Sequence, residues 1–301
     1  MVHGPPKDRA LLTGSPTIAG MNAMCPPYDI ADPAAVVDGL SERLPHFGDI
    51  RWVQATGSTN ADLLARARSA DEPPRPWLLG THLQQAGRGR AGRPWRSAVG
   101  ECLTVSCAFD VDMPARHLPS LSPLAGLAAC EALRALAPDN ARSTVVKWPN
   151  DLQLGDKKLG GILVESVRRP GARHYTVVIG MGMNLHNAAA LSHALGRDVS
   201  DWSEVTGKPC ETQTVVILAS TLARAWGDMI EALSRSSFAA FSARYAAVDA
   251  LSGRTVDVTD QGRILFSGMA DGCDEAGRLR VVTSEGVQPV AVGDVSVRAR
   301  S

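Results

Sequence analysis

The feature that most constrains the fold of this chain is an alternation between short β-rich runs and longer helical segments, from about residue 50 to 248. Such alternation favours an α+β or α/β catalytic domain, in which helices cover a sheet. A first helix is expected after Asp32, a favoured N-cap, with Pro33 in its first turn. Strands are predicted at residues 50–53, 77–82, 103–108, 145–148, 159–166 and 175–181. Further helices are predicted at residues 60–70, 121–136, 212–234 and 238–246.

The two ends of the chain differ from this middle part. Residues 251–300 hold short alternating runs separated by Gly and Asp, which predicts a small β-barrel or sandwich. The first residues are rich in Pro, Gly, Ser and Thr without apolar periodicity, which is typical of a flexible segment. We therefore expect a flexible leader at 1–28, a catalytic domain at 29–248 and a C-terminal β-barrel at 249–301.

Composition argues against several classes of protein. Lys plus Arg and Asp plus Glu number 31 each, so the net charge does not indicate a nucleic-acid, membrane or polyanionic partner. No stretch approaches about 20 apolar residues, and the N-terminus lacks the apolar core of a secretory signal. The cysteines show neither a C-x-x-C pair nor metal-ligand spacing, so we expect no metal-binding residues, and reduced thiols in a cytoplasmic protein. They are Cys25, Cys102, Cys107, Cys130, Cys210 and Cys273.

The strongest local feature is the run from Gln84 to Trp95, in which three glycines and three arginines alternate in its central part. Such a run predicts a loop whose backbone N–H groups and guanidinium groups could close on a phosphate or a carboxylate. A solvated basic loop and an RNA-binding Arg-Gly segment are the alternatives, and the neutral chain weighs against the second. The run lacks the Gly-Lys-Ser/Thr ending of a Walker loop.

A second run, Val145 to Asp151, ends a predicted strand with a lysine, a tryptophan, a proline, an asparagine and an aspartate. Charged residues at a strand end often belong to a site, although Pro-Asn-Asp is also a common tight turn. The following run, residues 157–165, is predicted as the return strand of a hairpin. Lys157 or Lys158 could then lie near Asp151 and direct a positive charge into a pocket, or be an ordinary surface lysine.

Two further motifs remain ambiguous on sequence alone. Ser58, Thr59 and Asn60 are favoured helix-capping residues, and the same groups could bind ligand oxygens. Residues 179–184 form a predicted strand with two glycines, which indicates close approach of another backbone or of a ligand. No Ser/His/Asp or Cys/His arrangement offers a nucleophile for covalent catalysis.

Together, in this order and spacing, these segments resemble the biotin protein ligase family. The resemblance covers roughly Ala31 to the C-terminus and depends above all on the joint occurrence of the Arg-Gly loop and the Lys-Trp-Pro-Asn-Asp run. The matching elements are Ser58–Asn60, Gln84–Arg90, Trp95 with Gly100, Lys147–Asp151, Lys158–Glu165 and Ile179–Asn184.

The resemblance implies an α+β fold with a mixed-sheet catalytic domain and a small C-terminal SH3-like β-barrel. It also implies a reaction in two steps with biotin, ATP and Mg²⁺. The biotin carboxylate attacks the α-phosphorus of ATP to give biotinyl-5'-AMP, and a lysine of a biotin carrier protein then takes the acyl group. The implied carrier is a subunit of acetyl-CoA carboxylase. Both steps gather negative charge near the α-phosphate, so positioning and electrostatic stabilisation should dominate catalysis.

Residue roles also follow from the resemblance. Arg90, Lys158 and Asp151 are the expected catalytic residues: Arg90 should be the most costly arginine to replace, Lys158 would steady the developing anion, and Asp151 would orient the incoming amine or a magnesium ion. Ile162 and Leu163 would line the pocket wall, and Trp202 could cover the adenine. Biotin contacts are implied for Ser58, Thr59, Asn60, Gln84, Arg88, Gly89, Arg90, Lys158 and Gly161. Nucleotide contacts are implied for Arg88, Arg90, Trp95, Lys147, Asn150 and Asn184.

Two rival functions remain. A lipoate ligase or a lipoyl or octanoyl transferase shares the fold and the carrier lysine, but the complete loop from Gly87 to Arg93 favours biotin. A non-catalytic binder or repressor is the other. Some family members carry an N-terminal helix-turn-helix domain, whereas fewer than 60 residues precede Ser58 here. We therefore expect no DNA partner and no membrane partner, and a monomer or weak homodimer.

Overall fold

The computed structural model describes residues 32–69, 72–137, 143–293 and 295–300, so the predicted leader lies outside the described residues. Its larger sheet has seven strands in the order β1-β2-β3-β7-β6-β5-β4. The pair β1–β2 is parallel, and every other neighbouring pair is antiparallel, so the sheet is mixed as predicted. The strands are β1 Asp49–Thr56, β2 Trp77–Gln84, β3 Cys102–Val111, β4 Thr144–Lys147, β5 Asp151–Leu154, β6 Lys157–Val167 and β7 Tyr175–Asn184.

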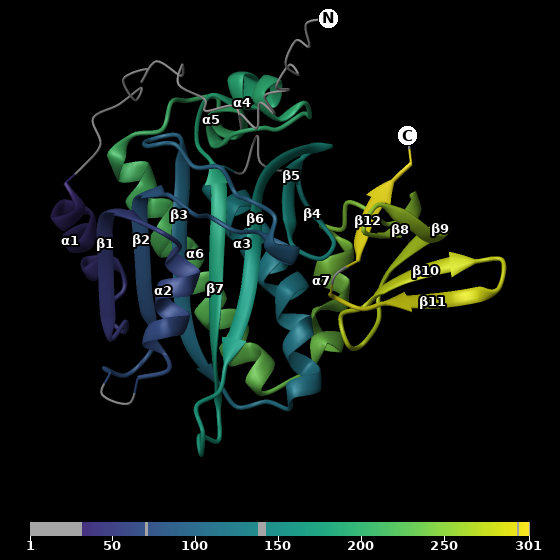
Figure 1. The fold of residues 1–301 in the computed structure, drawn as a ribbon, viewed down its shortest axis with the longest axis horizontal. Coiled ribbons are helices and arrows are strands. Elements are labelled where there is room, and N and C mark those ends of the chain that lie inside the picture. Colours follow the sequence, from purple (N-terminus) through teal and green to yellow (C-terminus); the bar gives the residue numbers. More distant parts are fainter. Residues whose placement is uncertain (1–31, 70–71, 138–142, 294, 301) are drawn as a thin grey trace, which may run out of the picture.

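Helices cover both faces of this sheet (Figure 1). On one face, α1 (Pro33–Arg43), α3 (Leu121–Leu136) and α6 (Thr212–Ser234) pack in a single large apolar cluster. On the other face, the short helix α2 (Thr59–Arg66) packs Leu63 and Leu64 against Trp77 in a smaller cluster. The remaining helices are α4 Ala188–Leu195, α5 Trp202–Thr206 and α7 Ser242–Ala246, with 3-10 turns at Arg90–Gly92, Ala115–Ser120 and Phe238–Phe241.

A local signal accounts for where α1 begins. The side chain of Asp32 accepts a hydrogen bond from the Ala34 N–H at 2.8 Å, and Pro33 opens α1, as predicted. The single helix predicted at 238–246 is wrong in its first half, which is a 3-10 turn. In a 3-10 turn, residues three apart lie on the same side, so Phe238 and Phe241 are both buried.

The second sheet is formed by the C-terminal residues and is antiparallel throughout, in the order β11-β10-β9-β8-β12. Its buried side chains belong to the same apolar cluster as α3 and α6, so the two sheets share one core. Figure 1 shows the second sheet next to α7. The Trp148 indole N–H donates to the Gly277 carbonyl at 3.1 Å and joins the larger sheet to the smaller one. The strands are β8 Thr255–Asp260, β9 Arg263–Cys273, β10 Leu279–Thr283, β11 Gly286–Val290 and β12 Ser296–Ala299.

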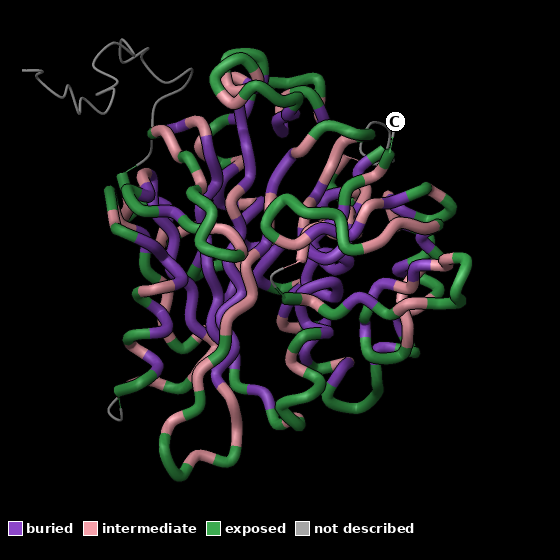
Figure 2. The backbone as a smooth tube through the Cα atoms, turned by 45° about the vertical axis from the view of Figure 1, so that its right-hand side comes forward, coloured by how far each residue is buried: buried purple, intermediate pink, exposed green. Residues whose placement is uncertain are grey.

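Buried residues form a continuous interior, and many of the loops that connect the strands and helices are exposed (Figure 2). Burial also raises the pKa of Cys102, Cys130 and Cys210 to about 12, so these thiols stay protonated at neutral pH and are poor nucleophiles. The five cysteines within the described ranges are free. Across those same ranges, we find no helix with the length and apolar character needed to cross a bilayer.

Candidate functional site

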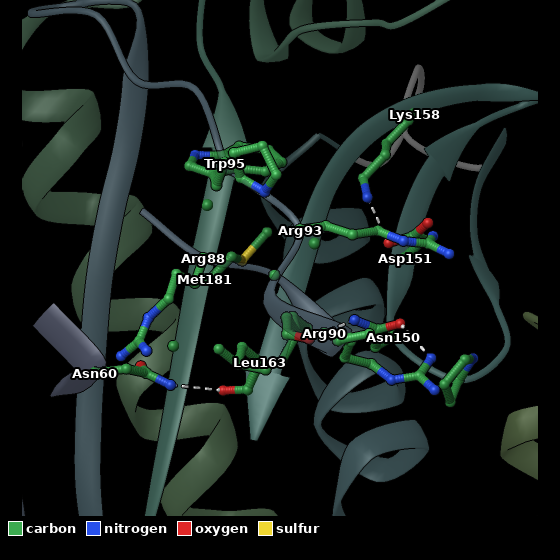
Figure 3. Close-up of a pocket in the computed structure, with 18 of the residues that line it drawn as sticks. Asn60, Arg88, Arg90, Arg93, Trp95, Asn150, Asp151, Lys158, Leu163 and Met181 are labelled. Carbon is green, nitrogen blue, oxygen red and sulfur yellow. Dashed lines mark hydrogen bonds and ion pairs between the residues drawn. The ribbon is translucent and has the colours of Figure 1, made fainter. Parts of the chain in front are cut away.

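A cavity of about 470 Å³ opens between the larger sheet, the Arg-Gly loop and the segment that leads into β12. Figure 3 shows Asn60 and Leu163 at one end of it and Lys158 with Asp151 at the other. All predicted site residues except Asn184 and Trp202 line this cavity, although they come from distant parts of the sequence. They are Ser58, Thr59, Asn60, Gln84, Arg88, Gly89, Arg90, Trp95, Lys147, Asn150, Asp151, Lys158 and Gly161.

Two residues expected to contact nucleotide lie elsewhere. Asn184 is buried at the end of β7, where its amide N–H donates to the Ser200 carbonyl at 2.9 Å. It therefore holds the chain that follows β7 and does not line the cavity. Trp202, expected to cover adenine, begins α5 and is buried in the large apolar cluster.

The Arg-Gly loop has a defined shape. The Trp95 N–H donates to the Gly87 carbonyl at 2.8 Å, and the Gly89 N–H donates to the Arg93 carbonyl at 2.7 Å. Gly87 is needed at the loop base, because a Cβ there would lie 2.6 Å from Gln84 Nε2 and 2.8 Å from the Trp95 carbonyl. The loop is therefore closed at its base, and its arginines extend from a fixed backbone.

The second sheet holds this loop in place. Arg90 Nη2 donates to the carbonyl oxygens of Gly293 and Val295, and Arg90 Nη1 donates to Asn150 Oδ1 at 3.4 Å. Arg93 Nη2 donates to Ser296 Oγ at 2.8 Å. The C-terminal unit thus contributes to the cavity wall. The resemblance implied that this unit helps with ATP or carrier docking, with a stabilising cap as the alternative. The bonded pairs themselves could not be predicted, because their members are about 200 positions apart and carry no shared motif.

Lys158 and Asp151 form the ion pair expected from the hairpin. Lys158 Nζ lies 2.6 Å from Asp151 Oδ1 and 5.8 Å from the centre of the Trp95 ring. Gly161 leaves the space that this pair needs, because a Cβ there would lie 3.3 Å from Lys158 Nζ and 3.4 Å from Asp151 Oδ1. Lys157 points elsewhere and lies 3.8 Å from Glu204. Of the two candidate lysines, Lys158 is therefore the one in the cavity.

The cavity is strongly cationic. Among the described residues that line it, Asp151 is the single carboxylate, and Arg197 and Arg298 join the predicted cations. Burial lowers the pKa of Lys147 below its ordinary value of 10.5, and the positive charges of Lys158 and Arg298 lower it further. The negative charge of Asp151 raises it, but by less than the others lower it. Such a surplus of cations suits a ligand with several negative charges. The cationic side chains are Arg88, Arg90, Arg93, Lys147, Lys158, Arg197 and Arg298.

The opposite end of the cavity is lined by the polar side chains of Ser58, Thr59, Asn60 and Gln84, and Figure 3 shows Arg88 extending toward Asn60 there. Ser58 caps α2 through a 3.4 Å bond from the Ala61 N–H and also lines the cavity, so both predicted roles are geometrically compatible. Gln84 Oε1 accepts from the Thr59 N–H at 2.9 Å.

In the described residues, no group of three or more His, Cys, Asp or Glu side chains is placed to hold a metal ion.

The two glycines of β7 make room for side chains. A Cβ at Gly180 would lie 2.0 Å from Asn60 Oδ1, and one at Gly182 would lie 2.3 Å from the Trp95 ring. Close approach was predicted here, but of another backbone or of a ligand. The structure instead places side chains from α2 and the Arg-Gly loop against these glycines.

Gly182→Ala is expected to destabilise the protein by about 1–3 kcal/mol, because the added methyl overlaps the Trp95 ring and forces it to move. Gly227→Ala is the matched control within α6. Its Cβ would meet nothing nearer than 3.7 Å, and alanine in a helix interior should stabilise by up to about 1 kcal/mol. Urea denaturation of both variants measures the two effects. Equal stability of the two variants would contradict the close packing of Trp95 on β7.

Comparison with known proteins accords with this geometry. Residues 52–184 match the model of the biotin/lipoate A/B protein ligase family, and residues 251–298 match the biotin protein ligase C-terminal domain. A biotin–[acetyl-CoA-carboxylase] ligase of Paracoccus denitrificans is 31% identical over 245 residues, which cover 80% of this chain and 97% of that protein. The chain belongs to the biotin protein ligase family.

Two further relatives show how far the likeness extends. A bifunctional ligase/repressor of Escherichia coli is 32% identical over 216 residues, and the match covers 72% of this chain and 64% of that relative's length. The biotin protein ligase of Aquifex aeolicus, solved in complex with biotin and ATP, shares the fold with a TM-score of 0.66 at 22% identity. That match covers 84% of this chain and all of the other.

Proposed function

We propose that the protein joins biotin to a lysine of a biotin carrier protein at the expense of ATP, through biotinyl-5'-AMP. The observation that carries this proposal is a cavity that has hydrogen-bonding side chains at one end, from Ser58–Asn60 and Gln84, and the Lys158–Asp151 pair at the other, with cations along its wall. A neutral cyclic urea with a carboxylate tail suits such a cavity, because the tail would reach the cations where the ATP phosphates bind.

In the first step, a biotin carboxylate oxygen attacks the α-phosphorus of ATP, a new O–P bond forms, and pyrophosphate leaves. Lys158 and Arg90 would stabilise the charge that gathers on the α-phosphate, because hydrogen bonds from donors already held in place become stronger as the acceptor gains negative charge. Mg²⁺ would enter with ATP as part of the substrate, held mainly by phosphate oxygens. Asp151 is the carboxylate that could add a protein ligand to it.

In the second step, the carrier lysine amine attacks the acyl carbonyl carbon, an amide bond forms, and AMP leaves with the bonding electron pair. Asp151 would orient this amine and accept its proton, because its carboxylate lies beside Lys158 at the cationic end of the cavity. The carrier is inferred to be the biotin carrier subunit of acetyl-CoA carboxylase, as the name of the Paracoccus relative suggests. We further infer a cytoplasmic enzyme that works as a monomer or weak homodimer.

Separating the two half-reactions tests this proposal. The purified protein is incubated with biotin and MgATP without a carrier, and the bound ligand is identified by mass spectrometry. Retained biotinyl-AMP and released pyrophosphate are expected, followed by release of AMP when a carrier domain is added. A protein that forms an adenylate with lipoate and none with biotin would be a lipoate ligase. A protein that binds biotinyl-AMP but labels no carrier would be a binding module.

Lys147 should give the ATP affinity an unusual pH dependence. Because its pKa is lowered, Lys147 loses its proton at a lower pH than an ordinary lysine, and the neutral amine attracts phosphates less. The KM for ATP is therefore expected to rise as the pH increases above neutrality. Lys147→Arg should flatten this rise, since arginine stays charged, whereas exposed Lys208→Arg should not. Identical pH profiles for all three proteins would exclude a charged Lys147 from ATP binding.

A further inference from the structure

A chain of hydrogen bonds connects the end of the cavity at Thr59 and Asn60 with Glu165 on β6, which does not line the cavity. Asn60 Nδ2 donates to Glu165 Oε2 at 2.9 Å and to the Leu163 carbonyl at 3.2 Å. Ser106 Oγ donates to Asn60 Oδ1 at 2.7 Å, and Thr59 Oγ1 lies 2.7 Å from Ser106 Oγ. Figure 3 shows the link from Asn60 to the Leu163 carbonyl.

The acceptors at one end of this chain determine the direction of every bond in it. A carbonyl and a carboxylate only accept, so the Asn60 amide must turn its NH₂ group toward Leu163 and Glu165. Its oxygen then faces Ser106, whose single hydroxyl hydrogen is used on that oxygen. Ser106 Oγ can therefore only accept from Thr59. An alternative acceptor, Gln84 Oε1 at 3.2 Å, would also use the Thr59 hydrogen.

The consequence is that Thr59 Oγ1 offers lone pairs, and no hydrogen, to the cavity that it lines. Thr59, Asn60 and Ser106 are all nearly fully buried, so water does not readily replace a missing partner. A buried polar group that loses its partner is costly, which keeps the chain in this one arrangement.

We propose that Glu165 is a positioning residue for ligand recognition: acting through Asn60 and Ser106, it keeps Thr59 a hydrogen-bond acceptor and so selects a ligand that donates an N–H. The inference rests on the proposed function, in which that donor is a ureido N–H of biotin. Glu165 would not touch the ligand, and its effect would be confined to binding at the end of the cavity that Thr59 lines.

Two substitutions break the chain at different links. Glu165→Leu removes the nearer acceptor of Asn60 and leaves only the longer bond to the Leu163 carbonyl, at 3.2 Å, to orient the amide. Ser106→Ala removes the hydroxyl that connects Asn60 with Thr59. Each is expected to raise the dissociation constant of biotin about tenfold, the usual effect of leaving a buried polar group without its partner. The kcat at saturating biotin should stay within about twofold, because the reacting atoms lie at the other end of the cavity.

Rescue and ligand choice separate positioning from a merely structural role. Glu165→Gln should bind biotin nearly as the unmodified protein does, because its amide oxygen can still accept from Asn60. Glu131→Leu is the matched control, since Glu131 pairs with Arg244 and does not line the cavity. A biotin analogue with oxygen in place of one ureido N–H should bind the unmodified protein more weakly than biotin. Glu165→Leu and Ser106→Ala should reduce this preference.

Calorimetric titration with biotin and with the analogue measures these constants without turnover, and carrier labelling is measured alongside. Unchanged biotin affinity and unchanged ligand preference in both broken variants, with normal labelling by the unmodified protein, would overturn the role of Glu165 and leave the ligase function standing. An unmodified protein that neither binds biotin nor labels the carrier would overturn both.

Discussion

Replacement of Lys158 by alanine is expected to lower kcat for adenylate formation about 10²- to 10³-fold, the usual effect of removing one donor that stabilises a developing anion. Lys158 is held for this task by Asp151 at 2.6 Å, and the Trp95 ring lies beside it. The ammonium group lies in the cavity beside Asp151, where we propose that the carboxylate meets the α-phosphate. Biotin affinity should change much less than the rate.

Pyrophosphate release in single-turnover experiments measures this rate directly. Lys157→Ala is the matched control, since it removes a neighbouring lysine that points toward Glu204 at 3.8 Å. The control should retain nearly full activity. Equal losses in the two variants would mean that Lys158 contributes only to the general positive field of the protein.

Arg90→Ala is expected to reduce adenylate formation about 10²-fold and to shorten the time for which biotinyl-AMP stays bound. The guanidinium group lines the cavity and also bonds Asn150, Gly293 and Val295. The substitution therefore removes a charge from the part of the cavity where we propose that the phosphates bind, and releases the Arg-Gly loop from the second sheet. A loop that moves more freely encloses the adenylate less well.

The lifetime of bound biotinyl-AMP measures the effect of Arg90, with Arg235→Ala as the control because Arg235 forms an exposed pair with Glu231. Unchanged retention and unchanged ligation in Arg90→Ala would exclude a phosphate role for this arginine. If Arg90→Ala loses biotinyl-AMP and Arg90→Lys retains it as the unmodified protein does, the effect is due to the charge and not to the bonds with the second sheet.

Long periodic segments were predicted well from sequence. The helix at 212–234 and the helix at 121–136 have their predicted ends, because extended apolar periodicity specifies a helix without tertiary information. Short elements were missed: β5 has four residues, and α5 has five. Elements of this length are stabilised by their partners, so β5 exists because β4 and β6 pair with it. The predicted domain boundaries at 28 and 248 stay predictions.

The candidate site was predictable where function imposes an unusual local sequence. Trp148 to Asp151 could be either a turn or a site from sequence, and the structure shows a turn that carries Asn150 and Asp151 into the cavity. Arg197 and Arg298 were missed because no local pattern distinguishes them from surface arginines. Asn184 lies outside the cavity because the chain after β7 folds over it. The roles of the site residues stay predictions.

The central claim is that this cavity transfers a biotinyl group to a carrier lysine, and the intact mass of the carrier tests it most directly. The purified protein is incubated with MgATP and a biotin carrier domain, once with biotin and once with lipoate. We predict that the carrier gains the mass of one biotinyl group, that Lys158→Ala slows this gain, and that lipoate gives none. A carrier that gains a lipoyl group but no biotinyl group, or that stays unmodified with both acids, would contradict the account.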